Sequence, residues 1–364
     1  MTSSPYENLP SSSFWRTGVA NQVFPNISGL YKKKFPISTD TKIATAGSCF
    51  AQHISRYLRK NGFNVINREP PPPGLSEVNA MKFGYGMYSA RYGNIYTTRQ
   101  LWQLALEAFG KRTVRDDCWR KDSGYVDALR PNVEPFGLSS PEEVRVHRQY
   151  HLKQVKALML ETELFIFTFG LTESWESKVD GTAYPTCPGT IAGTFDAEHY
   201  KFCNYSYNEV MNDFIGFYNF AKRQNPNLKF LITVSPVPLT ATAGPHHVLQ
   251  ATTHSKSVLR AVAGSLADDY EDIDYFPSYE IITAPWTKGR FYAPNFRNVV
   301  EDGVDAVMRT FFAEHGDRIL PPGPGAIRTE DPGDECVSED DAVCEELLLD
   351  AFGKGRNGER TEKS

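Results

Sequence analysis

Short apolar runs, each bounded by glycine, proline or polar residues, recur along the chain from residue 42 onward. Such runs are typical of strands in a parallel sheet whose two faces are both covered by helices. They predict five strands, at residues 43–46, 63–66, 164–169, 230–234 and 274–276.

Between these runs, apolar residues follow helical spacing, and several segments carry helix-end signals. The first helical segment ends at Asn61-Gly62, and another stops before Asn225-Pro226. Helices are predicted at 50–61, 97–110, 141–161, 208–224, 248–269 and 302–314. Strands that alternate with helices predict a doubly wound α/β sheet of about five strands.

The remaining segments divide the chain around one domain. We expect an irregular N-terminal arm at 1–40 and a single domain at 41–319. Two insertions are predicted near 112–140 and 176–207, the second as an ordered loop lid. The acidic and then basic tail, 320–364, is expected to be largely disordered apart from a short helix at 339–352.

Composition and charge exclude several classes of function. The net charge of −5 gives no basic surface for a nucleic acid, and no nucleic-acid-binding motif is recognisable. The six cysteines lack C-x-x-C spacing, so neither a zinc site nor another cofactor is expected. No run of 18 apolar residues and no secretory signal is visible, which predicts a cytoplasmic protein without a membrane span.

The candidate chemistry lies at Gly47-Ser48-Cys49, between the first strand and the first helix. Ligands of open α/β sheets bind at the carboxyl ends of the strands, and helix N-termini favour negative charge. Ser48 is therefore a candidate nucleophile whose own N–H would help to stabilise an oxyanion. The alternatives are that Ser48 only caps the helix, or that the Cys49 thiol is the nucleophile.

The stretch Gly47-Ser48-Cys49-Phe50-Ala51 spells the signature of the GSCFA family, which is placed with the SGNH (GDSL-type) hydrolases. Further stretches resemble the later blocks of that family: YSARYGNIYTTRQL at 88–101, TFGLTESW at 168–175, TVSPVP at 233–238, HVLQATTHSKSVLR at 247–260, YFPSYE at 275–280 and RFY at 290–292. The resemblance implies a three-layer α/β/α sandwich with flavodoxin-like strand order, and Ser48 as the nucleophile.

The resemblance also implies further oxyanion donors. A backbone glycine after the second strand is the usual second donor, and Gly86 is favoured here over Gly84 and Gly93. The third donor is normally an asparagine, where this chain has Thr172. The alternatives are that the glycines form a plain loop and that Thr172 and Glu173 cap a helix.

The general base departs from the family pattern. SGNH enzymes carry Asp-x-x-His before the last helix, and the corresponding residues here are Asn295-Phe-Arg297-Asn298. His247, on the loop after the fourth strand, is the best substitute, because a pKa near ~6.5 suits a general base. The alternatives are His246 as the base, or His247 as a cap of the 248–269 helix.

Polar and aromatic side chains of the same blocks are candidate substrate contacts. An arginine fork matches a carboxylate or phosphate, although an ion pair within the protein is the alternative for each arginine. An aromatic platform for a sugar ring is the role considered for the tryptophan and tyrosine, with core packing as the alternative. The candidates are Arg91, Asn94, Glu173, Trp175, Tyr184 and Asn295.

Together these features predict a serine-dependent acyl-ester hydrolase or O-acyltransferase that acts on a carbohydrate or polysaccharide. Its partners would be a small-molecule or glycan substrate and an acyl donor. The alternative is a non-catalytic module that binds a glycan or a carrier in the same cleft. The missing Asp-x-x-His would be the mark of that second function.

Overall fold

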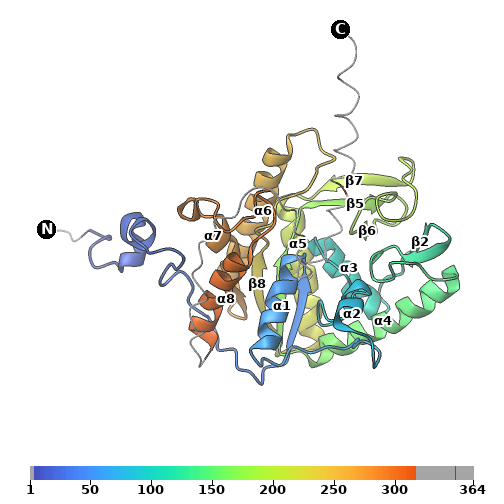
Figure 1. Ribbon diagram of the computed structural model, residues 1–364, viewed down its shortest axis with the longest axis horizontal. Coiled ribbons are helices and arrows are strands. Elements are labelled where there is room, and N and C mark those ends of the chain that lie inside the picture. The colour runs from blue at the N-terminus through green and yellow to red at the C-terminus, as the bar shows by residue number, and fades with distance from the viewer. Residues whose placement is uncertain (1–3, 317–348, 350–364) are drawn as a thin grey trace, which may run out of the picture.

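The computed structural model describes residues 4–316 and Leu349. These residues form a parallel sheet of four strands, in the order β1 (Ile43–Gly47), β4 (Leu164–Phe169), β8 (Lys229–Val234) and β9 (Ile273–Tyr275) (Figure 1). Gly47 pairs with Thr168, and Thr168 pairs with Thr233, so three strands end at the same edge. The sheet therefore collects residues 47, 168 and 233 from distant parts of the sequence.

The segment predicted as the second strand contributes a single bridge. Val65 pairs in parallel with Ile43, on the side of β1 that faces away from β4. With this bridge, the order of the five predicted segments is 2-1-3-4-5, which is the flavodoxin-like order. The predicted fold class is confirmed, although the parallel sheet of the described residues has four strands rather than five.

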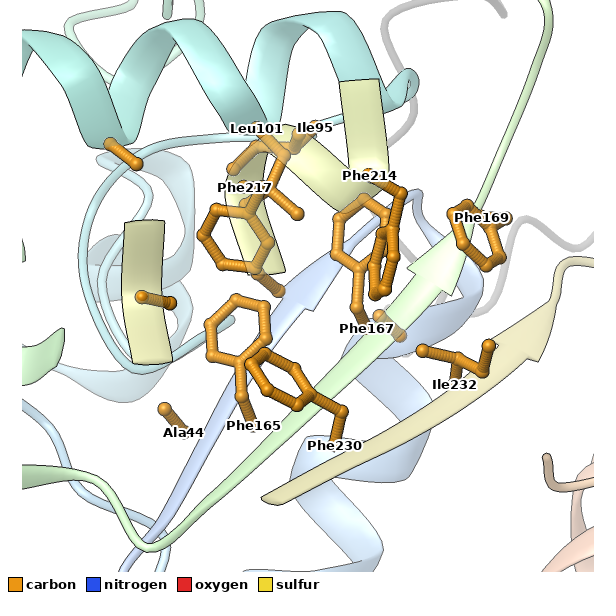
Figure 2. Packing of buried hydrophobic residues seen from close by; sticks show 14 of the residues in the cluster. Ala44, Ile95, Leu101, Phe165, Phe167, Phe169, Phe214, Phe217, Phe230 and Ile232 are labelled. Carbon is orange, nitrogen blue, oxygen red and sulfur yellow. The ribbon is translucent and has the colours of Figure 1, made fainter. Parts of the chain in front are cut away.

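Helices cover both faces of the sheet. Strand residues Phe165, Phe167 and Phe169 pack on one face against α3 (Thr98–Ala108), α4 (Pro141–Glu161), α5 (Tyr207–Gln224) and α6 (Val248–Asp269) (Figure 2). The alternate residues Leu164 and Ile166 pack on the other face against α1 (Phe50–Lys60), α7 (Ser278–Thr283) and α8 (Glu301–His315). Since successive strand side chains point to opposite faces, the fully buried strand β4 packs against helices of both outer layers.

All six predicted helices are present, with ends shifted by no more than two residues. Two short helices were not predicted, α7 and α2 (Glu77–Lys82). Helix α2 is capped by Ser76, whose hydroxyl oxygen accepts a hydrogen bond from the Asn79 N–H. Helices of six residues carry too few turns to show a helical period, which explains why both were missed.

The two insertions contain strands. The first holds a hairpin of β2 (Cys118–Lys121) and β3 (Gly124–Asp127). The second was predicted as a loop lid, and this prediction is wrong. Residues 173–204 form an antiparallel sheet in the order β6 (Ala183–Tyr184), β5 (Glu173–Ser177) and β7 (Tyr200–Asn204). Cross-strand packing of Trp175 against Phe202 stabilises this small sheet.

The N-terminal arm contacts the domain through the aromatic ring of Phe24. In the arm, Phe24 packs on Trp286 and Phe291, whereas Phe14 and Trp15 are exposed. The helix predicted at 339–352 lies outside the described residues, except for Leu349. Within the described part of the chain, no helix combines the length and the hydrophobicity that a membrane span requires.

Candidate functional site

The corner between β1 and α1 requires a glycine. Gly47 has a φ of +140°, and a Cβ at this position would lie 2.5 Å from the Thr168 carbonyl oxygen. A larger residue would therefore separate β1 from β4 where both strands end. The tight corner brings Ser48 directly to the carboxyl edge of the sheet.

Ser48 is 2% exposed, and its backbone is held on both sides. Its N–H donates to the Thr168 carbonyl oxygen over 3.3 Å, and its carbonyl oxygen accepts from the Ala51 N–H over 2.9 Å. In contrast, no group of the described residues lies within hydrogen-bond distance of its Oγ. The alternative of Ser48 as a side-chain cap of α1 is therefore wrong, since a cap requires that bond.

The residues after β4 pack directly on Ser48. A Cβ at Gly170 would lie 2.9 Å from the Ser48 Cβ, so only glycine allows this approach. The Thr168 hydroxyl, at the end of the same strand, is also buried without a hydrogen-bond partner. Two unpartnered hydroxyl groups thus belong to the neighbouring strand ends of β1 and β4.

The second sequence block meets the corner through Asn94, Ile95 and Tyr96. The Ile95 N–H donates to the Gly47 carbonyl oxygen over 2.9 Å, and the Tyr96 carbonyl oxygen accepts from the Gly170 N–H over 3.1 Å. Asn94 Oδ1 accepts from Gln52 Nε2 over 3.1 Å and from the Tyr88 hydroxyl. The structure therefore places the predicted residue Asn94 beside the first turn of α1.

Tyr88 and Gln52 complete this group, and sequence reasoning did not assign them to it. The Tyr88 hydroxyl lies 3.0 Å from the Ser48 carbonyl oxygen, and Gln52 Nε2 lies 3.3 Å from that hydroxyl. Both side chains are buried. A signal existed for Gln52, a polar residue on the inward face of the first helix, one turn after Ser48.

A lysine reaches the corner from α6. Lys256 is 2% exposed, and its Nζ donates to the Gly170 carbonyl oxygen over 2.7 Å. Arg260, one turn further along, pairs instead with Glu280. The two basic residues at the end of the 247–260 block therefore have different partners, and of the two only Lys256 contacts the residue that packs on Ser48.

An apolar pocket of about 430 Å³ lies beside these residues. Leu171, which follows Gly170, lines it, as do the predicted residues Glu173 and Trp175. Burial raises the pKa of the Glu173 carboxyl group, although the hydrogen bond of 2.8 Å from the Thr242 hydroxyl acts in the opposite direction. Glu173 and Trp175 are thus placed to contact a ligand.

A family model matches this chain over residues 42–311, with the description GSCFA family. The chain belongs to the GSCFA family. The match begins just before β1 and ends within α8, so it includes the Ser48 corner, the pocket and Lys256. A search of curated proteins returned no match.

In this GSCFA protein, Gly86 does not meet the corner. Its carbonyl oxygen accepts a hydrogen bond from Arg59 Nη1, at the far end of α1 from Ser48. Eleven residues of helix span about 16 Å. The described contacts at the corner come from residues 94–96 of the same block and not from Gly86, so the prediction of Gly86 as an oxyanion donor has no support among them.

The hydroxyl of Thr172 is also used elsewhere. Thr172 is fully buried, and its hydroxyl donates to Asn204 Oδ1 over 2.6 Å while its N–H donates to Ser255 Oγ over 3.0 Å. A hydroxyl has one proton, so Thr172 has none left for an oxyanion. The alternative of a helix cap fails as well, because β5 follows Thr172.

His247 forms the helix cap that the sequence left as the alternative. It is exposed at the start of α6, where its Nδ1 accepts from the Leu249 N–H over 3.1 Å. His246 and His254 are also exposed, and the His53 ring packs against Phe50. Among the described residues, none of these four imidazoles is a hydrogen-bond partner of the Ser48 Oγ.

Three further candidates have structural partners. Arg91 donates to Glu134 over 2.8 Å and stacks on Tyr85, so it forms the ion pair within the protein that was its alternative role. Tyr184 is 1% exposed, and its hydroxyl donates to the Asp116 carbonyl oxygen. Asn295 is exposed, and its Oδ1 closes a turn by accepting from the N–H groups of residues 297 and 298.

The Cys49 thiol and metal binding are the two remaining kinds of candidate chemistry. Cys49 is buried beside Ser48, as expected of a cysteine that turns inward to pack. Within the described residues, no group of three or more His, Cys, Asp or Glu side chains is placed to hold a metal ion. The fold thus brings together a candidate nucleophile, a buried lysine and an apolar pocket.

Proposed function

We propose that this GSCFA protein is a serine-dependent acyl-ester hydrolase or O-acyltransferase that forms an acyl-enzyme at Ser48. The observation that carries the proposal is the Ser48 Oγ, which is buried without a partner at the carboxyl edge of the parallel sheet. Buried hydroxyl groups normally form hydrogen bonds, so an unpartnered one requires an explanation. The resemblance to SGNH hydrolases supports the same role.

In the proposed reaction, Ser48 Oγ attacks the acyl carbonyl carbon and the bond to the alcohol oxygen breaks. The Oγ proton passes to a base and then to the departing alcohol oxygen. Water or a sugar hydroxyl next attacks the acyl-serine, which gives hydrolysis or transfer and restores Ser48. The first-turn N–H groups of α1 favour the negative charge that develops on the carbonyl oxygen.

Lys256 is the base that we propose in place of His247. Its Nζ contacts the carbonyl oxygen of Gly170, and Gly170 packs on Ser48. Lysine serves as the base for serine nucleophiles in other folds, because loss of solvent favours the neutral amine. His247 is exposed and caps its own helix, which leaves it no comparable contact with the corner.

The alcohol half of the substrate is proposed to be a carbohydrate. Sugar hydroxyls need polar partners, and the Glu173 carboxyl group and Thr242 hydroxyl supply them at the pocket beside Ser48. Because Ser48 is only 2% exposed, substrate binding must displace the side chains that cover it. The same burial favours the second candidate function, a module that binds a glycan or carrier without turnover.

Steady-state hydrolysis of para-nitrophenyl butanoate tests the proposal. The wild-type protein should turn over the ester, and Ser48→Ala should abolish turnover. Lys256→Met should lower the rate by about 10²-fold or more, the usual contribution of a general base, whereas His247→Ala should change it less than about threefold. Glycan binding without any turnover in the folded wild-type protein would favour the binding module instead.

A further inference from the structure

The apolar pocket beside Ser48 has the size of a small-molecule site. Its volume of about 430 Å³ lies within the range of ligand pockets in proteins. One wall is the antiparallel sheet of β5 to β7, where the Trp175 ring packs against Phe195 and Phe202. The opposite wall includes Leu239 and Ala241, which follow β8. Aromatic and aliphatic side chains thus face the enclosed space from two sheets.

An aliphatic side chain already lies in this pocket. Leu349 is the one described residue beyond position 316, and it lines the pocket together with the aromatic residues. Its side chain is half-buried there, although it comes from a part of the sequence far from every other lining residue. An aliphatic side chain from far along the sequence thus forms part of the apolar wall of the pocket.

Packed side chains connect the wall of the pocket with the Ser48 corner. Leu171 lines it and follows Gly170, the residue that packs on Ser48. Leu171 also belongs to one buried cluster with Tyr96 and Leu239, so the wall runs without a break from the corner to the pocket.

We propose that the apolar walls of this pocket bind the hydrocarbon chain of the acyl group, while Glu173 and Thr242 remain the polar partners of the sugar, so that the substrate is an ester of an aliphatic acid longer than acetate. This inference rests on the proposed function, since it assigns the pocket to the acyl half of that reaction. Each added methylene group of the chain removes further apolar surface from water, until the pocket is full. Chain length, rather than charge, then determines which ester is preferred.

Calorimetric titration of the full-length Ser48→Ala protein with two neutral amides tests the pocket without turnover. Octanamide should bind more tightly than butanamide by about fourfold for each additional methylene group. Ala241→Trp fills the pocket and should weaken octanamide binding at least tenfold. Val179→Trp is the matched control, because Val179 is 58% exposed and does not line the pocket.

The possible results distinguish a failure of the pocket assignment from a failure of the proposed reaction. Equal affinities for the two amides, no octanamide binding, or octanamide binding that Ala241→Trp leaves unchanged would each overturn the pocket assignment. Chain-length-dependent binding that only Ala241→Trp removes would support it. If wild-type protein with that binding pattern failed to hydrolyse butanoate and octanoate esters, the proposed function would fail while the pocket remained an aliphatic site.

Discussion

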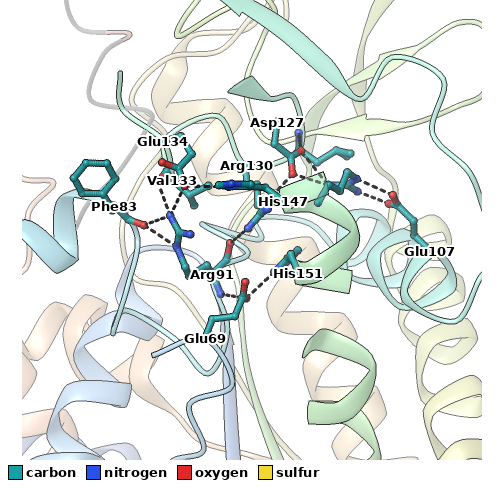
Figure 3. Close-up of polar contacts among 12 residues, drawn as sticks. Glu69, Phe83, Arg91, Glu107, Asp127, Arg130, Val133, Glu134, His147 and His151 are labelled. Atoms are coloured by element: carbon teal, nitrogen blue, oxygen red, sulfur yellow. Dashed lines mark hydrogen bonds and ion pairs between the residues drawn. The ribbon is translucent and has the colours of Figure 1, made fainter. Parts of the chain in front are cut away.

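Two buried polar regions of this protein differ in whether their polar side chains have partners. The paired cluster comprises Glu69, Arg91, Glu107, Asp127, Arg130, Glu134, Arg148 and His151, each of which contacts an ionisable partner within the cluster (Figure 3). The Ser48 corner, in contrast, contains two hydroxyl groups with no hydrogen-bond partner among the described residues. The same chain therefore pairs many buried charges in one region and leaves the hydroxyl groups of Ser48 and Thr168 without a partner in the other.

Asp127 shows how the paired cluster works. Its carboxylate accepts from Arg130 over 2.7 Å and from Arg148 over 2.9 Å, while Arg148 also pairs with Glu107. Burial raises the pKa of Asp127, but Arg148 and Arg130 outweigh burial and lower it to about 2. Each buried charge has an opposite charge in contact, which is the condition under which burial is tolerated.

The difference shows which buried residues are structural. Arg91 was a candidate for substrate binding because an arginine fork suits an anion, yet it belongs to the paired cluster, where it pairs with Glu134. Ser48 had helix capping as its alternative role, yet it forms no such bond. Pairing within the protein thus explains the burial of Arg91, whereas neither capping nor pairing explains the burial of the Ser48 hydroxyl.

The largest expected effect comes from breaking the paired cluster. Asp127→Ala leaves Arg130 and Arg148 buried with a lost counter-charge and should lower the free energy of unfolding by about 3–5 kcal/mol. Urea denaturation at pH 7 measures this. Glu142→Ala, whose side chain is 78% exposed in its pair with Arg145, should cost less than about 1 kcal/mol. Similar losses in both variants would contradict the account.

Acid should weaken the same cluster. Burial, and then Arg130, lower the pKa of His151 to about 4, against the opposing effect of Glu69. His151 therefore takes up a proton near pH 6.5 in the unfolded chain, but only near pH 4 in the folded protein. The stability is fully present above pH 6.5 and should fall by roughly 2–3 kcal/mol as the pH drops to 4.

Urea denaturation across this pH range, with His151→Gln as the comparison, measures that loss. The variant removes the titrating group, so its free energy of unfolding should depend less on pH between 6.5 and 4. An equally steep dependence in the variant would show that other groups cause the loss.

A matched pair of serines sharpens the comparison at smaller magnitude. Ser255 Oγ accepts a hydrogen bond of 3.0 Å from the Thr172 N–H, and the residue is fully buried. Ser255→Ala should cost about 1–3 kcal/mol in urea denaturation, because it leaves a buried N–H unsatisfied. Ser48→Ala removes a hydroxyl that has no partner and should cost less than 0.5 kcal/mol or stabilise the protein. The reverse ranking would contradict the distinction drawn here.

A smaller loss of stability than that of Ser255→Ala is expected at His247. His247→Ala removes only the cap of α6, so the free energy of unfolding should fall by about 1 kcal/mol or less. Thermal denaturation measures the change. If ester turnover fell with the stability unchanged, His247 rather than Lys256 would be the base.

The sequence predicted those parts of the fold that depend on local pattern. The apolar run 164–169 indicated a doubly buried strand, and the small residues after 46 indicated a strand-to-helix corner. The site around that corner depends on contacts between distant residues. Thr172 is bound by Asn204 and Ser255, and Lys256 contacts Gly170 across 86 positions. No period or spacing in the chain shows which of these partners will meet.

The most direct test of the central claim is intact-protein mass spectrometry after incubation with an alkyl fluorophosphonate. The account predicts one adduct on the folded wild-type protein, mapped by peptide sequencing to Ser48 and absent from Ser48→Ala. Folded wild-type protein that stays unmodified, or an adduct that persists in Ser48→Ala, would contradict the assignment of Ser48 as the nucleophile.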